Sequence, residues 1–90
     1  MNLEEYKELI KQYTEALIGY HEIEFKYNNR TYSLERDSEA QYAVWQFEPG
    51  ASSGTKIATA STPEELFKLK CFNGKTVFEI EDDVTDSIVF

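Results

Sequence analysis

The chain has 90 residues, 41% of them hydrophobic and 14% aromatic, which is enough for one folded domain over residues 1–90 and argues against disorder. Nine basic against 17 acidic side chains give a net charge of −8, which argues against direct contact with nucleic acid or an anionic membrane. No apolar run approaches the ~20 residues that span a bilayer, and the acidic start Leu3-Glu4-Glu5 is unlike a signal peptide. We therefore expect a cytoplasmic protein.

Residues 3–18 carry apolar side chains at spacings of three and four, which predicts an amphipathic helix. Asn2 can cap this helix, and Glu5 stands at the position of a reciprocal capping box. Gly19 can end it. The stripe that we expect to face the core consists of Leu3, Tyr6, Leu9, Ile10, Tyr13, Ala16 and Leu17.

Residues 23–34 predict a β-hairpin. Apolar residues alternate up to Tyr27 and again from Tyr32, and Asn28 and Asn29 lie between the two strands. Asn tolerates the positive φ that a type I′ turn requires at both central positions. A one-residue slip would turn one strand's apolar groups to the wrong face. The expected register pairs Tyr27 with Arg30, Phe25 with Tyr32, and Ile23 with Leu34.

A third strand is expected over residues 41–48. We expect Trp45 and Phe47 to face the core, because they have the larger apolar area. Tyr42 and Val44 would then lie on the outer face of the sheet.

Two polar segments flank this third strand: Asp37–Glu39 as a turn and Pro49–Gly54 as a flexible loop. The loop lacks the spacing of a phosphate-binding loop. A fourth strand is expected over Thr55–Ala60, followed by a helix that Thr62 caps and Pro63 begins. The core-facing residues of this helix are Leu66, Phe67 and Leu69.

Residues 76–84 support two interpretations. Val77, Ile80 and Val84 have helical spacing, which favours a short helix. A second hairpin about the breaker Asn73–Gly74 is the alternative. Together the elements predict an α+β domain with an N-terminal helix, an antiparallel meander of three or four strands, and one or two short C-terminal helices on one face of the sheet.

The chain resembles a group of small uncharacterised bacterial and prophage proteins, mostly from Gram-positive organisms. The likeness rests on Glu22–Ser33 (EIEF-x-YN-x-R-x-YS), Thr62–Phe67 (TPEELF) and residues 73–83 (NGKT, then EI-x-DD). Glu81 stands where that group often has Trp. The resemblance implies a helix-plus-sheet fold and an origin in a mobile element. It carries over no site residue, since the group has no assigned activity.

Candidate catalytic and metal-binding residues are few. His21 and Cys71 are the one histidine and the one cysteine of the sequence, and no flanking pattern marks either as reactive. Zinc needs several such ligands, and the acidic residues after Thr76 lack the alternating spacing and the glycine of a calcium loop. We therefore expect no catalytic activity, no cofactor and no metal.

Two functional hypotheses follow. The leading one is a small protein-binding module that acts through an unidentified protein partner, with a homodimer through an edge strand as a further possibility. The alternative is a DNA-mimic-type inhibitor, whose carboxylates on a rigid helix occupy the basic groove of a nucleic-acid-binding protein. The apolar groups assigned to an interaction surface are Tyr42, Val44, Ile88 and Phe90. The carboxylates assigned to it are Asp82, Asp83 and Asp86.

Overall fold

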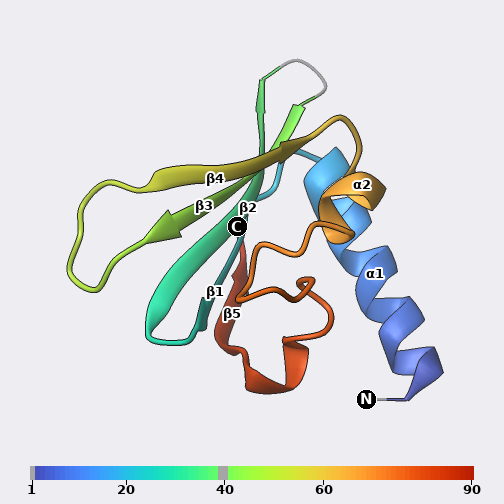
Figure 1. Cartoon of the computed structure of the whole chain (residues 1–90). Coiled ribbons are helices and arrows are strands. Elements are labelled where there is room, and N and C mark those ends of the chain that lie inside the picture. The colour runs from blue at the N-terminus through green and yellow to red at the C-terminus, as the bar shows by residue number, and fades with distance from the viewer. Residues whose placement is uncertain (1, 39–40) are drawn as a thin grey trace.

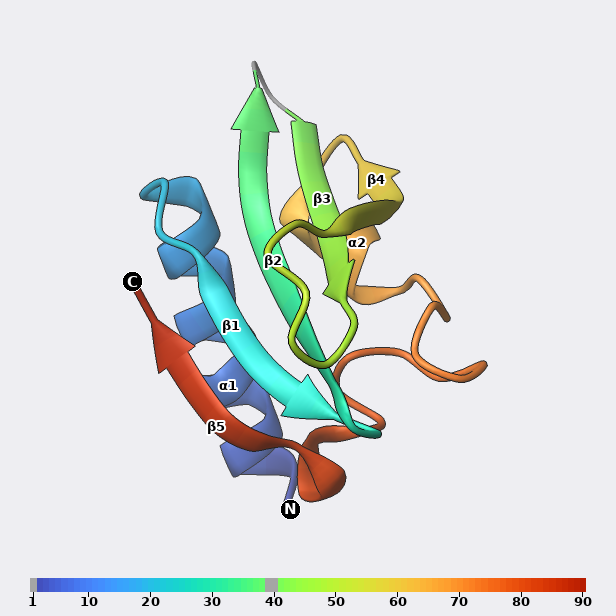
Figure 2. The ribbon, with the colours of Figure 1, turned by 90° about the vertical axis from the view of Figure 1, so that its left-hand side faces the viewer.

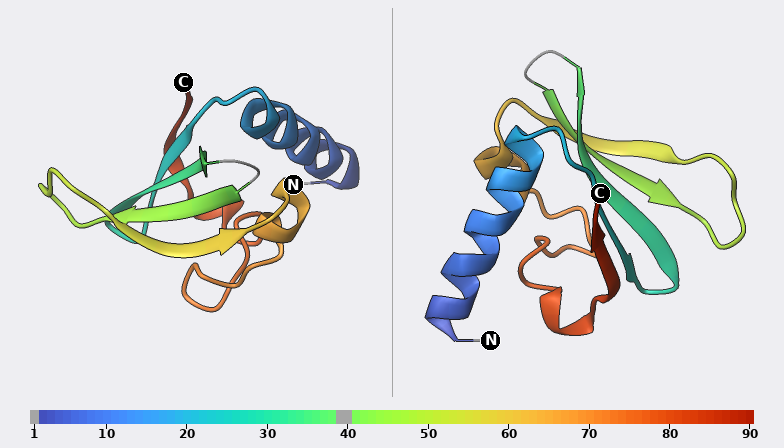
Figure 3. Two further views of the ribbon diagram at one scale, coloured as in Figure 1. Left: turned by 90° about the horizontal axis from the view of Figure 1, so that it is seen from above. Right: turned by 180° about the vertical axis from the view of Figure 1, so that it is seen from behind.

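The protein forms two layers, a five-stranded antiparallel sheet and two helices that cover one of its faces (Figures 1 and 3). The strand order is β4-β3-β2-β1-β5, and the structure, a computed structural model, describes residues 2–38 and 41–90. The predicted α+β class is confirmed, and the C-terminal segment adds a fifth strand to the expected meander. The elements are α1 (Leu3–Ile18), β1 (Ile23–Tyr27), β2 (Arg30–Ser38), β3 (Gln41–Phe47), β4 (Thr55–Ala60), α2 (Pro63–Phe67), the 3-10 helix η1 (Glu81–Asp83) and β5 (Thr85–Val89).

The predicted hairpin between β1 and β2 forms with the expected register. Its turn residues Asn28 and Asn29 have φ angles of 52° and 63°, as a type I′ turn requires. The alternating apolar side chains of both strands therefore share the face beneath the helices. The pairs are Ile23 with Leu34, Phe25 with Tyr32, and Tyr27 with Arg30.

The helix α1 begins and ends where its capping residues predict. The Asn2 side chain accepts a hydrogen bond from the backbone N–H of Glu5 at 2.8 Å and donates one to the Glu5 carboxylate at 3.1 Å. Gly19 follows the helix with φ of −80°, so the left-handed residue at this end is Tyr20, with φ of 63°. The Arg36 guanidinium lies 4.5 Å from the Tyr20 ring centroid, a cation–π contact that holds the exposed ring against the sheet.

The two faces of β3 are the reverse of those predicted. Tyr42 and Val44 are buried in the core, whereas Trp45 and Phe47 are half-buried on the opposite face. The register with β2 decides this, because Val44 pairs with Leu34 and directly paired residues share a face of the sheet. The prediction from side-chain area was therefore wrong, because the register of β3 with β2 fixes which of its side chains face the core.

Other residues on the outer face of the sheet partly cover the side chains of Trp45 and Phe47. The Lys56 ammonium lies 5.3 Å from the Trp45 ring centroid. The loop between β3 and β4 passes so close to Phe47 that a Cβ at Gly54 would lie 2.7 Å from its ring. The predicted loop Pro49–Gly54 thus covers part of the sheet, and glycine permits the close approach.

The strand β4 and the start of α2 match their predictions. Thr62 caps α2 and accepts a hydrogen bond from the backbone N–H of Glu65 at 3.1 Å, and Pro63 is the first helical residue. The turn predicted at Asp37–Glu39 lies partly outside the described residues, and β2 continues to Ser38.

The α-helix predicted over residues 76–84 does not form. Asn73–Gly74 makes a tight turn closed by a bridge between Phe72 and Lys75. Thr76 and Glu79 then exchange a reciprocal pair of hydrogen bonds, which is the start of a helix, but only the three-residue η1 follows.

The chain leaves the helical path because β1 has an open edge that the C-terminal segment pairs with. β5 runs antiparallel along β1 and pairs Val89 with Ile23 and Ile88 with Glu24. Figure 2 shows β5 at the edge of the sheet, with α1 behind it. This pairing joins segments that are about sixty residues apart in the sequence, so no local sequence pattern predicts it.

Aromatic rings fill the core between the two layers. The Tyr13 ring of α1 lies 5.5 Å from that of Phe78, and the rings of Phe78 and Phe67 lie 5.0 Å apart. On the sheet, Phe25 stacks on Tyr32 with 5.7 Å between centroids. These ring contacts hold α2 and the C-terminal segment against α1.

Candidate functional site

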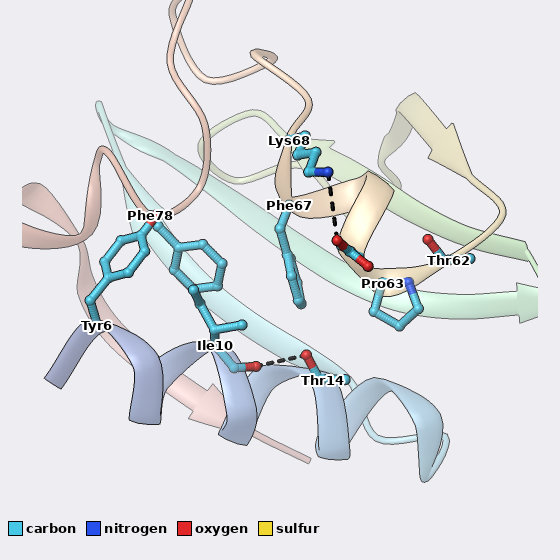
Figure 4. Close-up of a pocket in the computed structure, with 9 residues that line it drawn as sticks. Tyr6, Ile10, Thr14, Thr62, Pro63, Phe67, Lys68 and Phe78 are labelled. Carbon is cyan, nitrogen blue, oxygen red and sulfur yellow. Dashed lines mark hydrogen bonds and ion pairs between the residues drawn. The ribbon is translucent and has the colours of Figure 1, made fainter. Parts of the chain in front are cut away.

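A groove runs between α1 and α2 and opens to solvent (Figure 4). It encloses about 540 Å³, a volume typical of binding pockets. Its walls and floor are mainly apolar and come from Tyr6, Ile10, Thr14, Pro63, Phe67 and Phe78.

One wall of the groove is a stripe of α1. Tyr6, Ile10 and Thr14 are four residues apart and therefore lie on one side of the helix. The Thr14 hydroxyl donates to the backbone carbonyl of Ile10 at 2.7 Å, so it adds no unpaired polar group. Leu3 continues the stripe and is 68% exposed. The prediction that Leu3 packs in the core is therefore wrong, because the short helix α2 does not reach that turn of α1.

The opposite wall and the floor are aromatic. Phe67, at the end of α2, and Phe78 meet edge to face at the floor. Tyr6 packs on Phe78 with 5.3 Å between centroids. Figure 4 shows the rings of Phe67 and Phe78 between the α1 side chains and the α2 backbone. Both rings are buried, so the floor is held rigidly from beneath.

Two charged side chains line the groove, Glu64 and Lys68, and two further lysines lie beside it on α1. Lys7 and Lys11 do not line the groove, but each is exposed and directly follows a lining residue, Tyr6 or Ile10. Neither forms an ion pair with a described residue. Lys68, directly after α2, lines the groove and pairs at 3.6 Å with Glu64, which also lines it. The charges of the lining therefore balance each other, and Lys7 and Lys11 are the unpaired cations of α1 nearest to it.

The Tyr13 ring contacts the floor residues Phe67 and Phe78 and is buried, and the half-buried Glu81 lies near the Tyr13 hydroxyl. Burial raises the pKa of Tyr13 to about 12 and also raises the pKa of Glu81. The Tyr13 hydroxyl and one carboxylate oxygen of Glu81 have no hydrogen-bond partner among the described residues, although each is near enough to affect the ionisation of the other. Burial therefore favours the neutral, protonated form of Tyr13.

The apolar residues predicted to form an interaction surface divide into two pairs. Tyr42 and Val44 are buried, so the prediction that they lie on an exposed face is wrong. Ile88 and Phe90 are exposed at the β5 edge of the sheet.

The three aspartates assigned to the interaction surface are exposed, as predicted, but they do not lie on an α-helix. Asp82 and Asp83 lie on η1, and Asp86 pairs with Lys26 at 3.4 Å. A three-residue 3-10 helix does not hold carboxylates at the regular spacing on which the DNA-mimic hypothesis depended.

His21 and Cys71 do not line the groove. His21 Nδ1 donates a hydrogen bond to the Phe90 carbonyl, and burial raises the pKa of the half-buried Cys71 thiol. Among residues 2–38 and 41–90, no group of three or more His, Cys, Asp or Glu side chains could hold a metal ion. No helix in the same part of the chain is long and apolar enough to cross a membrane.

Sequence reasoning missed the groove because it assigned the whole apolar stripe of α1, from Leu3 to Leu17, to the core. The groove could have been predicted from the difference in length between the apolar stripe of α1 and the helix that follows Thr62. The apolar stripe extends from Leu3 to Leu17, whereas the local signals place only a short helix after Thr62. A short helix leaves part of a long stripe uncovered.

None of the known protein-family models, curated proteins or solved structures matches this chain. The resemblance of the hairpin and the capped helix to small prophage proteins therefore stays a prediction.

Proposed function

We propose that the protein is a non-catalytic binding module that takes an apolar segment of a partner protein into the groove between α1 and α2. The groove geometry carries this proposal. A helix stripe facing an aromatic floor is the arrangement that receives the apolar face of an amphipathic helix. The hydroxyls of Thr14 and Thr62 form hydrogen bonds within their own helices. We therefore expect the groove to bind a partner through apolar contacts and not to supply a nucleophile. The predicted cytoplasmic location is part of this proposal.

The lysines beside the groove determine the charge that we expect of the partner. Lys7 and Lys11 are free to pair, and Lys68 shares its charge only with an exposed Glu64. A helix that places apolar side chains in the groove would set its flanking residues beside these ammonium groups. Acidic flanks are therefore favoured over basic ones.

The test uses three helical peptides with the same leucines, spaced to present one face, and with flanks of Glu, Lys or Gln. We expect the Glu-flanked peptide to bind most tightly and to shift the amide NMR signals of Ile10, Thr14 and Phe67. Thr14→Arg fills the groove and should abolish these shifts. Gln12→Arg adds the same charge on the solvent side of α1 and should leave them intact.

Two results would count against the proposal. If none of the three peptides shifts the groove signals, the groove does not receive an apolar helix. If Thr14→Arg binds as well as Gln12→Arg, while circular dichroism shows both folded, the peptides bind elsewhere. Tighter binding of the Lys-flanked peptide would contradict the assignment of acidic flanks and leave the groove itself in place.

A further inference from the structure

Glu81 is a carboxylate that the fold partly buries without giving it a counter-ion. It is the first residue of η1, and one of its oxygens is buried with no hydrogen-bond partner among the described residues. No lysine, arginine or histidine in the described part of the chain forms an ion pair with it. A buried carboxylate without a partner is costly when it is ionised, so the closed fold favours the protonated form.

The side chains that face the Glu81 carboxyl group include no cation. Tyr13, from α1, has a buried hydroxyl that also lacks a hydrogen-bond partner among the described residues, and the two groups affect the ionisation of one another. Asp82, the next residue of η1, is exposed and adds a like charge. Ser87, from β5, lies near the Tyr13 hydroxyl and is uncharged. Burial first, and the charge of Asp82 after it, raise the pKa of Glu81.

Two connections join Glu81 to the floor of the groove. The N–H of Glu81 donates to the carbonyl of Phe78 at 3.4 Å, which is long for a hydrogen bond of this kind. The Tyr13 ring lies 5.5 Å from the Phe78 ring and 6.4 Å from the Phe67 ring, between centroids. Tyr13 therefore packs against the floor with its ring and faces Glu81 with its hydroxyl.

The η1 segment is the part of this region that can open. It is a single turn of 3-10 helix, which few hydrogen bonds hold together. Such segments open at a lower free energy than core strands. Ile80 on one side is fully buried and Val84 on the other is half-buried, so an opening is confined to Glu81–Asp83.

We propose that Glu81 is a pH-dependent switch beneath the groove. With the carboxyl group protonated, η1 stays closed over the Tyr13 hydroxyl. With the carboxyl group ionised, Glu81 turns to water, η1 opens, and the Tyr13 ring that supports Phe67 and Phe78 loses its cover. The groove should then bind an apolar helix more tightly in mild acid than at higher pH, a consequence that rests on the proposed function.

The direction of the effect follows from the pKa of Glu81 in the two forms. In the open form the carboxyl group has its ordinary pKa of 4.5, and in the closed form burial raises the pKa. As the pH rises above 4.5, the open form loses its proton first, so opening becomes progressively more favourable. Once the pH has passed the raised pKa, both forms are ionised and the balance no longer changes.

Amide hydrogen exchange of the free protein between about pH 5 and about pH 8 tests the opening itself. The reporter is the amide of Val84, which donates to the Glu81 carbonyl at 3.3 Å. We expect it to exchange faster than the amide of Leu34 in β2. Its rate relative to that in Glu81→Gln should rise about two-fold or more with pH. Asp83→Asn removes an exposed charge from the same turn and should keep the pH dependence of the wild-type chain.

Tyr13→Phe separates a switch from a merely structural role of Glu81. The Tyr13 hydroxyl lowers the pKa of Glu81, so its removal should move the pH dependence of Val84 exchange to higher pH. The carbon-13 NMR signal of the Glu81 carboxyl group should titrate at a correspondingly higher pH. This variant also decides the question if Glu81→Gln fails to fold.

The effect on the groove is measured with the Gln-flanked peptide, because its flanks do not titrate. We expect its affinity to fall as the pH rises, both in the wild-type chain and in Asp83→Asn. In Glu81→Gln the affinity should stay constant, since the side chain at this position has no proton to lose.

An exchange ratio that does not change with pH would overturn the switch. Exchange of Val84 at the rate of Leu34 would do so as well, because the opening would then be global unfolding. A peptide affinity that falls equally in the wild-type chain and in Glu81→Gln would exclude Glu81 as the group that controls the groove. If the peptide binds at no pH while the exchange ratio rises as expected, the proposed function is wrong and the switch stands.

Discussion

At the scale of single residues, Tyr13 and Glu81 each place a polar atom in an apolar surrounding. The buried Tyr13 hydroxyl and one oxygen of Glu81 have no hydrogen-bond partner among the described residues. Burial raises the pKa of both groups, because a low-dielectric surrounding disfavours the charged form. Ionisation of Glu81 therefore lowers the free energy of unfolding of the protein.

Glu81→Gln is expected to stabilise the protein at neutral pH and to have little effect in acid. The pKa of Glu81 is higher in the folded than in the unfolded chain, so the folded state binds more protons once the pH rises through the ordinary value of 4.5. Stability contributed by this group is then lost with rising pH until the folded pKa is passed. The melting temperatures of both proteins at about pH 4 and about pH 7 measure the difference. Asp82→Asn should raise the melting temperature at about pH 7 by a smaller amount, because the neighbouring Asp82 carboxylate contributes to the raised pKa of Glu81. An equal gain from Glu81→Gln at both pH values would contradict this explanation.

At the scale of secondary-structure elements, capping and turn residues position one wall of the groove and the strand that pairs with β5. The Thr62 cap and Pro63 set the start of α2 and hence one wall of the groove. The Asn28–Asn29 turn sets the register of β1 with β2, and β1 in turn receives β5. Both signals act within four residues, which is why local sequence predicts them.

Asn29→Ala is expected to lower the free energy of unfolding by about 1 kcal/mol, because a Cβ-bearing residue without a polar side chain is strained in the left-handed region. Asn29 has φ of 63°, and glycine adopts this angle freely. Asn29→Gly should therefore cost less than Asn29→Ala in urea denaturation. Equal costs for the two variants would show that the turn does not determine hairpin stability.

At the scale of the whole molecule, the sheet is completed by its most distant segment. β5 contacts β1 across most of the chain length, and the hydrogen bond of Phe90 to Glu22 extends the ladder by one residue. The side chains of β5 are exposed, so this strand contributes backbone pairing and cover for β1 more than apolar burial.

A chain that ends at Val84 is expected to lose about 2–4 kcal/mol of stability, since several ladder hydrogen bonds worth ~1 kcal/mol each are removed. The core residues Ile23 and Phe25 would then lie on an edge strand. Denaturation of this truncated chain beside one that lacks only Phe90 measures the contribution. Similar stability of the two truncated chains would contradict a structural role for β5.

Sequence alone determined the elements whose signals are local. The bounds of α1, the type I′ turn with its register, the extent of β4 and the capped start of α2 each follow from residues within a few positions of one another. The α+β class follows from their order.

Tertiary structure decided everything that depends on pairing between distant segments. The face of β3 follows its register with β2 rather than the size of Trp45, so Tyr42 and Val44 are buried. The segment after Thr76 begins as a helical turn but becomes a strand, because the edge of β1 offers it a hydrogen-bonded partner. The groove exists because α2 is shorter than the apolar stripe of α1 that it packs against, a relation that neither helix encodes by itself.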